Sequence, residues 1–204
     1  MEEIKFALDT FYAIMSGALV MWMAAGFTML EAGLVQKKDV SEIVTKNLGL
    51  FSIASVMYLV CGFMLMYPTD AVFSISGGLD EAGEAIVYGI LPAFGSSWGL
   101  STDMPLEEIG MAYGMDYSQQ ADFFFQVVFV ATAMSIVSGA VAGRMKLIPF
   151  FIFTVILTAF IYPVQGYWNW GGGFLSVLGY SDYAGSGTVH LLGAAAALGV
   201  VTLL

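Results

Sequence analysis

The sequence predicts an all-α integral membrane protein with five transmembrane helices, on three observations. Of the 204 residues, 59% are hydrophobic and 11% are charged, with a mean hydropathy of +0.84, whereas a soluble domain carries roughly 25% charged residues. Several uncharged runs reach the about 20 apolar residues that a spanning helix needs. Basic and acidic residues also alternate between the segments that join those runs, as expected when opposite sides of a membrane are occupied in turn.

Composition also limits the kinds of partner that the chain is expected to bind. The net charge of −10 would repel nucleic-acid phosphates and favours the approach of cations. We therefore expect a lipid bilayer around the chain and no nucleic acid. Cys61 is the only cysteine, so an internal disulfide is impossible. The chain starts with acidic residues and lacks the basic flank of a secretory signal peptide, so the first apolar stretch is expected to stay as a span.

Charged residues mark the limits of the apolar runs. The stretches 10–30, 47–69 and 123–143 are uncharged and of spanning length, and the run 147–181 is too long for one helix. It contains a glycine triplet that divides it, and residues 183–204 follow as the last apolar run. The expected helices cover residues 8–34, 42–67, 121–142, 147–167 and 183–204.

A further uncharged stretch, 85–102, is not expected to span the membrane. It contains Pro92, three glycines and two adjacent serines. This mixture is typical of a folded loop or a short re-entrant segment, because it breaks regular helices.

The charges also orient the chain. Five of the six basic residues lie by the first and third turns, which the positive-inside rule assigns to the cytoplasm. The segment 68–120 has no basic residue and is expected outside, as is the N-terminus, which makes the chain a multi-pass protein of the cell membrane. The basic residues are Lys37, Lys38, Lys46, Arg144 and Lys146, and the carboxylates of the outer segment are Asp70, Asp80, Glu81, Glu84, Asp103, Glu107, Glu108 and Asp116.

An odd number of spans is typical of one half of an inverted repeat, because a second five-helix unit would insert the other way up. The chain also stops inside an apolar run, Gly-Val-Val-Thr-Leu-Leu. We therefore expect these residues to be part of a longer polypeptide.

Ionisable residues inside a membrane are costly and are functional candidates. Asp182 is expected to start the last helix and to cap its free N–H groups. His190 then lies about 12 Å deeper along the helix, and its alternative role is a neutral histidine bonded to a neighbouring helix. Glycines and alanines make this helix thin. Glu31 precedes Lys37 and Lys38 by about two turns, which favours an interfacial carboxylate near basic neighbours.

Aromatic residues supply a second group of candidates. Trp170 precedes three consecutive glycines, a tight turn that an ordinary interfacial tryptophan does not need, and its ring could attract a small cation. Phe125 and Phe129 are four residues apart and share a helix face, although such pairs are often lipid-facing or core residues. The sequence has no phosphate loop, metal cluster or nucleophile–base pair, so neither an enzyme nor a cofactor or metal is expected.

Several motifs together resemble the ammonium transporter (Amt/Mep/Rh) family. The most specific is the run Asp182-Tyr-Ala-Gly-Ser-Gly-Thr-Val-His190, supported by Trp170-Gly-Gly-Gly173, Glu31-Ala-Gly-Leu-Val-Gln-Lys-Lys-Asp39 and Gly139-Ala-Val-Ala-Gly-Arg-Met-Lys146. The resemblance implies a homotrimer of eleven-helix channels, each built from two inverted five-helix repeats and a final helix. Residues 1–204 would then form one domain, the first repeat.

The resemblance also implies roles for individual residues. Phe129 and Trp170 are similar in position to the walls of the outer ammonium site, and Phe125 with Phe129 to the gate of the pore. Asp182 resembles the buried acid that organises the site, and His190 the first of two pore histidines. The implied function is transport of ammonium or ammonia, with methylammonium as an analogue.

The sequence departs from the family pattern in two respects, and it leaves two alternative functions open. Ser186 stands where the family commonly has a second glycine, and the second pore histidine belongs to the other half. The same fold could serve as an ammonium sensor coupled to a cytoplasmic signalling domain or regulatory partner. It could also be a structural five-helix membrane protein with no response to ammonium.

Overall fold

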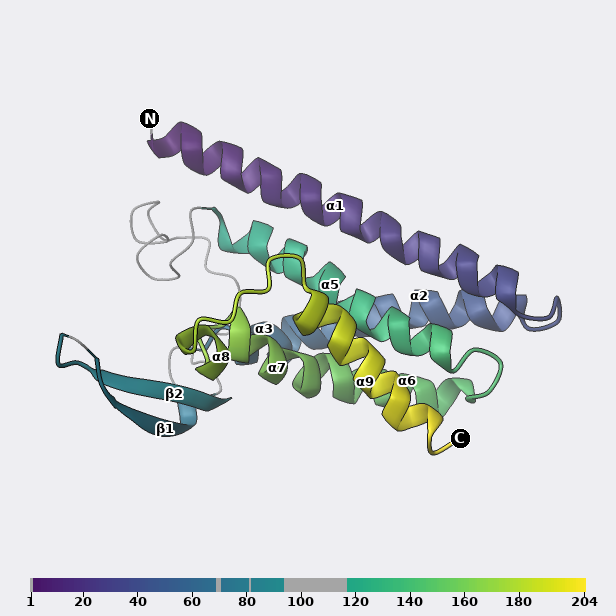
Figure 1. Cartoon of the computed structure of the whole chain (residues 1–204). Helices are drawn as coiled ribbons and strands as arrows, with labels where there is room; N and C mark the ends of the chain where they lie inside the picture. Colours follow the sequence, from purple (N-terminus) through teal and green to yellow (C-terminus); the bar gives the residue numbers. More distant parts are fainter. Residues whose placement is uncertain (1, 69–70, 81, 94–116) are drawn as a thin grey trace.

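The computed structural model describes residues 2–68, 71–80, 82–93 and 117–204 as a helical bundle with one β-hairpin (Figure 1). The first helices are α1 (Glu2–Leu34) and α2 (Val40–Met57), which continues through the π-helical turn η1 (Tyr58–Gly62) into α3 (Phe63–Met66). The hairpin consists of β1 (Ala71–Leu79) and β2 (Ala85–Pro92). The remaining elements are α5 (Gln119–Ala140), α6 (Leu147–Ile156), η2 (Leu157–Ile161), α7 (Tyr162–Asn169), α8 (Phe174–Val177), η3 (Ser186–Leu191) and α9 (Leu192–Val201).

Among the described residues, four helical segments are long and apolar enough to cross a membrane: Glu3–Leu34, Val40–Met66, Gln119–Ala140 and Leu147–Val177. They agree with the first four predicted spans, although α1 begins at Glu2 rather than near residue 8. The last helix, Ser186–Val201, is apolar but shorter, and it starts later than the predicted 183–204. The count of five spans therefore stays a prediction.

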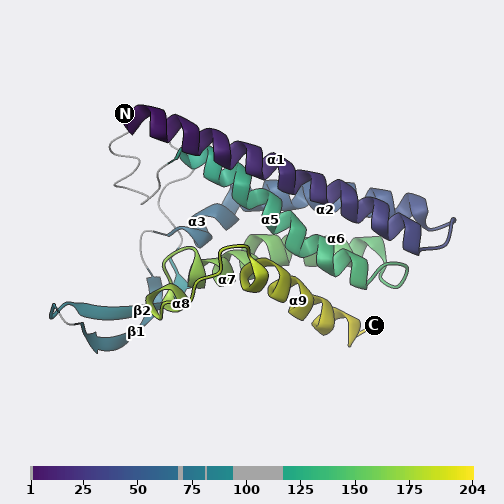
Figure 2. The ribbon, with the colours of Figure 1, turned by 45° about the horizontal axis from the view of Figure 1, so that its top comes forward.

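Helix α5 lies at the centre of the bundle, and α1, α2 and α9 pack against it (Figure 2). Its buried face is rich in small side chains, among them Ala131, Ala133 and Ser135. Gly193 of α9 packs so closely that a Cβ there would lie 2.9 Å from the Ala133 carbonyl oxygen. The thin surface expected for the last helix thus allows close contact between α5 and α9.

The helix 147–169 contains a π-helical turn because of Pro163. Proline has no N–H, so the carbonyl of Ala159, four residues earlier, loses its helical donor. The turn η2 accommodates this loss, and Cys61 Sγ on η1 donates to the Ala159 oxygen at 3.7 Å. The two π-helical turns, η1 and η2, therefore meet between neighbouring helices.

The turns of the bundle are sorted by charge. The α1–α2 and α5–α6 turns lie at the same end as the C-terminus, and the N-terminus and the hairpin lie at the other end (Figures 1 and 2). Lys37, Lys38, Arg144 and Lys146 are in the two turns of the first end. The arrangement confirms that the first and third turns share one side, as the sequence requires.

The prediction of a loop or re-entrant segment at 85–102 is wrong over residues 85–92, which form β2. This strand pairs antiparallel with β1, with Leu79 opposite Ala85 and Ala71 opposite Pro92. Aromatic and β-branched residues favour the strand, and Pro92 is tolerated at its end because the sheet has two edge strands. Residues 94–102 lie outside the described part of the chain.

Candidate functional site

Three of the predicted site residues form a row of aromatic rings. Phe125 and Phe129, on one face of α5, meet edge-to-face with ring centroids 5.0 Å apart. Phe129 in turn lies 6.1 Å from Trp170, at the end of α7, with the planes at 62°. All three side chains are half-buried. The structure therefore brings together residues 41 to 45 positions apart in the sequence, as edge-to-face packing favours.

The glycine triplet after Trp170 makes a turn that other residues could not. Gly172 has φ +82°, a region that costs an L-residue about 1–2 kcal/mol. A Cβ on Gly171 would overlap the Met66 carbonyl oxygen at the end of α3. The turn is thus packed against α3, and the indole N–H of Trp170 donates to the Asp182 carbonyl oxygen at 2.9 Å. Both contacts fix the direction of the Trp170 ring.

The Asp182 side chain caps the last helix from outside it. Its Oδ1 accepts the N–H of Ser186 at 2.9 Å, and its Oδ2 accepts those of Gly187 at 3.0 Å and Thr188 at 2.7 Å. The expected capping role is therefore present, but the expectation that Asp182 starts the helix is wrong. The helix starts at Ser186, because Gly185 turns the chain with φ +79° and returns the carboxylate to the free N–H groups.

These donors keep the Asp182 carboxylate ionised. Burial by itself would raise the pKa of the carboxyl, but hydrogen bonds from Thr188, Gly187 and Ser186 outweigh it and hold the pKa below its ordinary value. Backbone N–H groups favour the charged form in this way. A negative charge therefore stays fixed behind Trp170 at neutral pH.

Ser186 fits the run without strain. Among the described residues, positive φ occurs only at glycines, and Gly185 is one of them while Ser186 is not. Ser186 contributes its backbone N–H to Asp182, a contact that any non-proline residue can make. The departure from the family pattern at this position leaves the cap intact.

His190 lies in η3, with its side chain exposed. Its Nδ1 is 3.3 Å from the Gly185 carbonyl oxygen. In the tautomer protonated at Nδ1, this nitrogen donates to the carbonyl and leaves Nε2 as a free acceptor. The same glycine lies near Trp170, because a Cβ on it would be 3.3 Å from the indole ring. The Gly185 turn thus links His190 to the aromatic row.

Sequence reasoning missed two polar residues of this site. Thr188 is fully buried and gives Asp182 its shortest hydrogen bond. The Asn169 amide lies 3.2 Å from the Thr188 hydroxyl, and with its nitrogen turned toward the Tyr180 carbonyl it also reaches that oxygen at 3.0 Å. The only signal in the sequence was a pair of polar residues next to Trp170 and His190.

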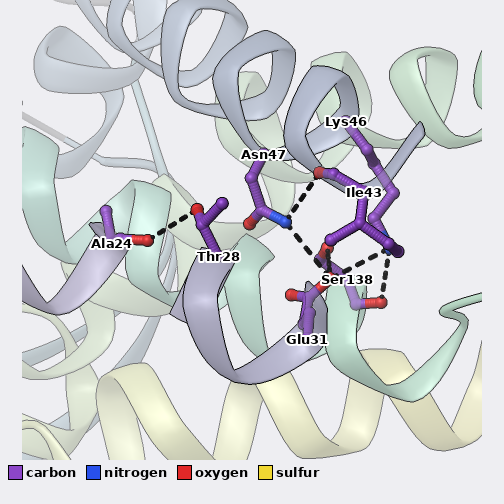
Figure 3. Close-up of polar contacts among 7 residues, drawn as sticks. All are labelled: Ala24, Thr28, Glu31, Ile43, Lys46, Asn47 and Ser138. Atoms are coloured by element: carbon purple, nitrogen blue, oxygen red, sulfur yellow. Dashed lines mark hydrogen bonds and ion pairs between the residues drawn. The ribbon is translucent and has the colours of Figure 1, made fainter. Parts of the chain in front are cut away.

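A second polar cluster lies near the basic end of the bundle (Figure 3). Glu31 Oε2 accepts from three side chains on two helices, α2 and α5: Lys46 Nζ at 3.1 Å, Asn47 Nδ2 at 3.2 Å and Ser138 Oγ at 2.8 Å. Lys46 Nζ also donates to the Ser138 carbonyl oxygen at 2.9 Å. Glu31 is only 3% exposed. The expectation of an interfacial carboxylate beside Lys37 is therefore wrong, because the helices turn this side chain inward.

The geometry suits recognition of a small cation. An electron-rich ring face attracts cations, and a fixed carboxylate behind it adds a favourable field. Among the residues that the structure describes, no group of three His, Cys, Asp or Glu side chains could hold a metal ion. The arrangement provides aromatic ring faces, an ionised carboxylate and an imidazole nitrogen that can accept a proton.

Comparison with known proteins identifies the family of this chain. The model of the Ammonium Transporter Family matches residues 11–204. Ammonium transporter Amt2 of Archaeoglobus fulgidus is 37% identical over 213 aligned residues, covering the whole of this chain and 40% of the relative. The chain therefore spans less than half the length of this curated relative.

Solved structures have the same fold. A protein described as a sensor Amt protein matches with a TM-score of 0.72 and 30% identity, over 95% of this chain and 43% of the other. Candida albicans Mep2 matches in fold, with a TM-score of 0.69 and 22% identity over 93% of this chain and 37% of Mep2. Since the family match covers nearly all 204 residues, the chain belongs to the ammonium transporter family.

Proposed function

We propose that this chain forms one half of a pore that conducts ammonium or ammonia across the cell membrane. The observation that carries the proposal is the row Phe125–Phe129–Trp170. The Trp170 indole donates to the backbone oxygen of Asp182, whose side chain caps the last helix. The row provides ring faces, and Asp182 provides a negative charge that its backbone donors keep ionised. The names of curated relatives, such as Amt2 of A. fulgidus, support the same substrate.

The cation is recruited at the hairpin end of the bundle. Asp80 and Glu84 lie in the hairpin turn, at the same end as the N-terminus and the Trp170 turn (Figure 1). Carboxylates around an entrance raise the local concentration of cations. Trp170 and Phe129 then bind the ion through their ring faces as it loses water.

The ion cannot cross the apolar interior as a bare charge, because a charge at mid-bilayer is prohibitive. It therefore gives up its proton or crosses with a separate proton route. Nε2 of His190, left free by the contact of Nδ1 with Gly185, accepts a hydrogen bond from ammonia or receives the proton. Phe125 and Phe129 form the gate before it.

The chain acts as the first five-helix repeat of a longer pore, with its N-terminus outside. Two observations support this. Basic residues cluster at the end of the bundle away from the N-terminus, and the chain covers 40% of the length of the A. fulgidus relative. The exposed side chain of His190 supports a lumen completed by further chain. Assembly as a homotrimer follows from the family alone.

Uptake of labelled methylammonium by the full-length protein in proteoliposomes tests the proposal. We expect Trp170→Leu and His190→Ala to reduce the uptake rate at least tenfold. Trp22→Leu is the matched control, because the Trp22 side chain on α1 is 74% exposed and outside the row. Uptake that is unchanged in both site variants would refute the assigned roles.

A second candidate function is ammonium sensing, favoured by the match to the sensor Amt protein at 30% identity. In that case the same site would bind ammonium and pass a conformational change to a cytoplasmic signalling partner. Binding of ammonium without any methylammonium uptake by the unmodified protein would favour the sensor. Uptake with saturation kinetics would favour the transporter.

A further inference from the structure

Asp122 is a buried carboxylate with an unmet acceptor, near the hairpin end of α5. Its side chain is 0% exposed. Oδ1 accepts the Tyr117 hydroxyl at 3.3 Å, whereas Oδ2 has no hydrogen-bond partner among the described residues. An acidic residue in a first helical turn usually serves the helix dipole. That role needs neither burial nor an unpaired oxygen, and the N-cap of α5 is already provided by Ser118.

Two further buried side chains in this region have unmet oxygens. Gln126 lies one turn along α5 and its amide interacts with the Asp122 carboxyl, yet its Oε1 has no partner in the described chain. Tyr162, at the start of α7, is 0% exposed, and its hydroxyl is also without a partner there. Unsatisfied buried polar groups are rare and costly. Two such groups near an unpaired carboxylate therefore indicate a ligand or ordered water.

Close contacts indicate that these groups share one region. A Cβ on Gly62, in η1, would lie 2.5 Å from the Tyr58 ring and 3.1 Å from the ring of Pro163, the neighbour of Tyr162. Phe63 of α3 meets Phe123 of α5 edge-to-face, with ring centroids 5.6 Å apart. The Tyr58 ring stacks on Phe123, 5.7 Å between centroids, which gives the region an aromatic wall beside the carboxylate.

Within the described part of the chain, Asp122 lacks a positively charged partner, and its second oxygen lacks a hydrogen-bond donor. The described residues give Asp122 a phenol and an amide but no ion pair. Lys46 pairs with Glu31, the basic residues of the α1–α2 and α5–α6 turns lie at the opposite end of the bundle (Figure 1), and Lys5 is exposed near the start of α1. Water could fill the hydrogen bonds but would leave the buried charge uncompensated. A small cation with several N–H donors meets both needs.

We propose that Asp122, with the oxygens of Gln126 and Tyr162 as further acceptors, forms a second cation site that holds one ammonium-class ion. The site differs from the row Phe125–Phe129–Trp170, since Asp122 and Gln126 are buried on α5 and Tyr162 is buried on α7, whereas the residues of the row are half-buried. It rests on the proposed function for the identity of the cation.

Infrared difference spectra of the purified protein test the site directly. Ammonium chloride is added at constant ionic strength, with potassium chloride as the reference, and the carboxylate stretching region is recorded. We expect an ammonium-induced carboxylate band that persists in Trp170→Leu and is lost in Asp122→Asn. Glu42→Gln removes an exposed carboxylate and is expected to leave the band unchanged. Trp170→Leu removes the outer site, so a band that persists in this variant reports binding at Asp122 and not transport.

Two milder variants keep the test valid if Asp122→Asn does not fold. Tyr162→Phe and Gln126→Leu each remove one acceptor, and each is expected to raise the half-saturating ammonium concentration of the band about tenfold. Three results would overturn the site: a band that survives in Asp122→Asn, an equal band with potassium, or a protonated Asp122 that does not respond to ammonium. Failure of methylammonium uptake with an intact band would instead count against the proposed function alone.

Discussion

Removal of Lys46 is expected to destabilise the bundle more than removal of any exposed lysine. Lys46→Met deletes the cation whose Nζ lies 3.1 Å from Glu31 Oε2 and leaves that carboxylate with Asn47 and Ser138 as its donors. Both partners of the pair are at most 5% exposed. Leaving one charge of a buried pair without its partner costs about 3–5 kcal/mol, because solvent cannot replace the lost partner.

The cost can be measured as a loss of thermal stability in detergent, followed by intrinsic fluorescence. A change of that size corresponds to a lower unfolding midpoint by on the order of 10 °C for a chain of this length. Lys37→Met is the matched control, since Lys37 is exposed in the α1–α2 turn, and a surface change of this kind stays within about 0.5 kcal/mol.

The double variant Glu31→Gln, Lys46→Met separates the interaction between the two charges from the other effects of removing each one. Both charges are then absent, so we expect the double variant to be more stable than Lys46→Met alone. The cycle of single and double variants should give a coupling of about 1–3 kcal/mol. A midpoint for Lys46→Met equal to that of Lys37→Met would refute the reasoning.

The remaining predictions concern the hairpin end of the bundle and the last helix. Gly185→Ala places a side chain at φ +79°, which costs about 1–2 kcal/mol and should slow methylammonium uptake, whereas Gly199→Ala, in open space, should do neither. Asp182→Asn should keep the fold but reduce uptake at least tenfold, because the amide carries no charge. Folding lowers the pKa of Asp182, so the ionised carboxylate should raise the free energy of unfolding relative to the Asp182→Asn variant. This difference is complete above the ordinary carboxyl pKa and is lost as the pH falls through the folded pKa. Urea titrations of both proteins from pH 7 to pH 3 would check it. Trp168→Phe removes the 2.8 Å bond from its indole N–H to the hairpin, and should cost about 1 kcal/mol and increase hydrogen exchange in β2.

The first four spans were predictable from sequence because charge is excluded from a lipid interior over a fixed length. The pairing of Glu31 was not, since sequence distance favoured Lys37 while the α1–α2 turn brings Lys46 to the same level. The start of the last helix was misplaced for a related reason. Local sequence identified Asp182 as a cap, but only the left-handed Gly185 allows a carboxylate to reach N–H groups four to six residues ahead.

The hairpin at 71–92 was missed for another reason. Its apolar residues alternate only partly with small ones, and glycines and Pro92 had suggested irregular structure. Its strands are stabilised by each other and by the indole of Trp168, a contact between distant segments that no local pattern records. The aromatic row, by contrast, was predicted in part, because Phe125 and Phe129 are at helical spacing.

The π-helical turn η2 makes the direction of Trp170 depend on where the helix that precedes it loses a residue. In such a turn the hydrogen bond spans one more residue than in an α-helix, so Leu157–Ile161 holds one residue more than α-geometry requires. Deleting one residue there would leave a regular α-helix and keep Trp170 close to Phe129. Deleting one residue from α6 would instead rotate α7 and Trp170 by about 100°, so a helix of equal hydropathy would turn Trp170 away from Phe129.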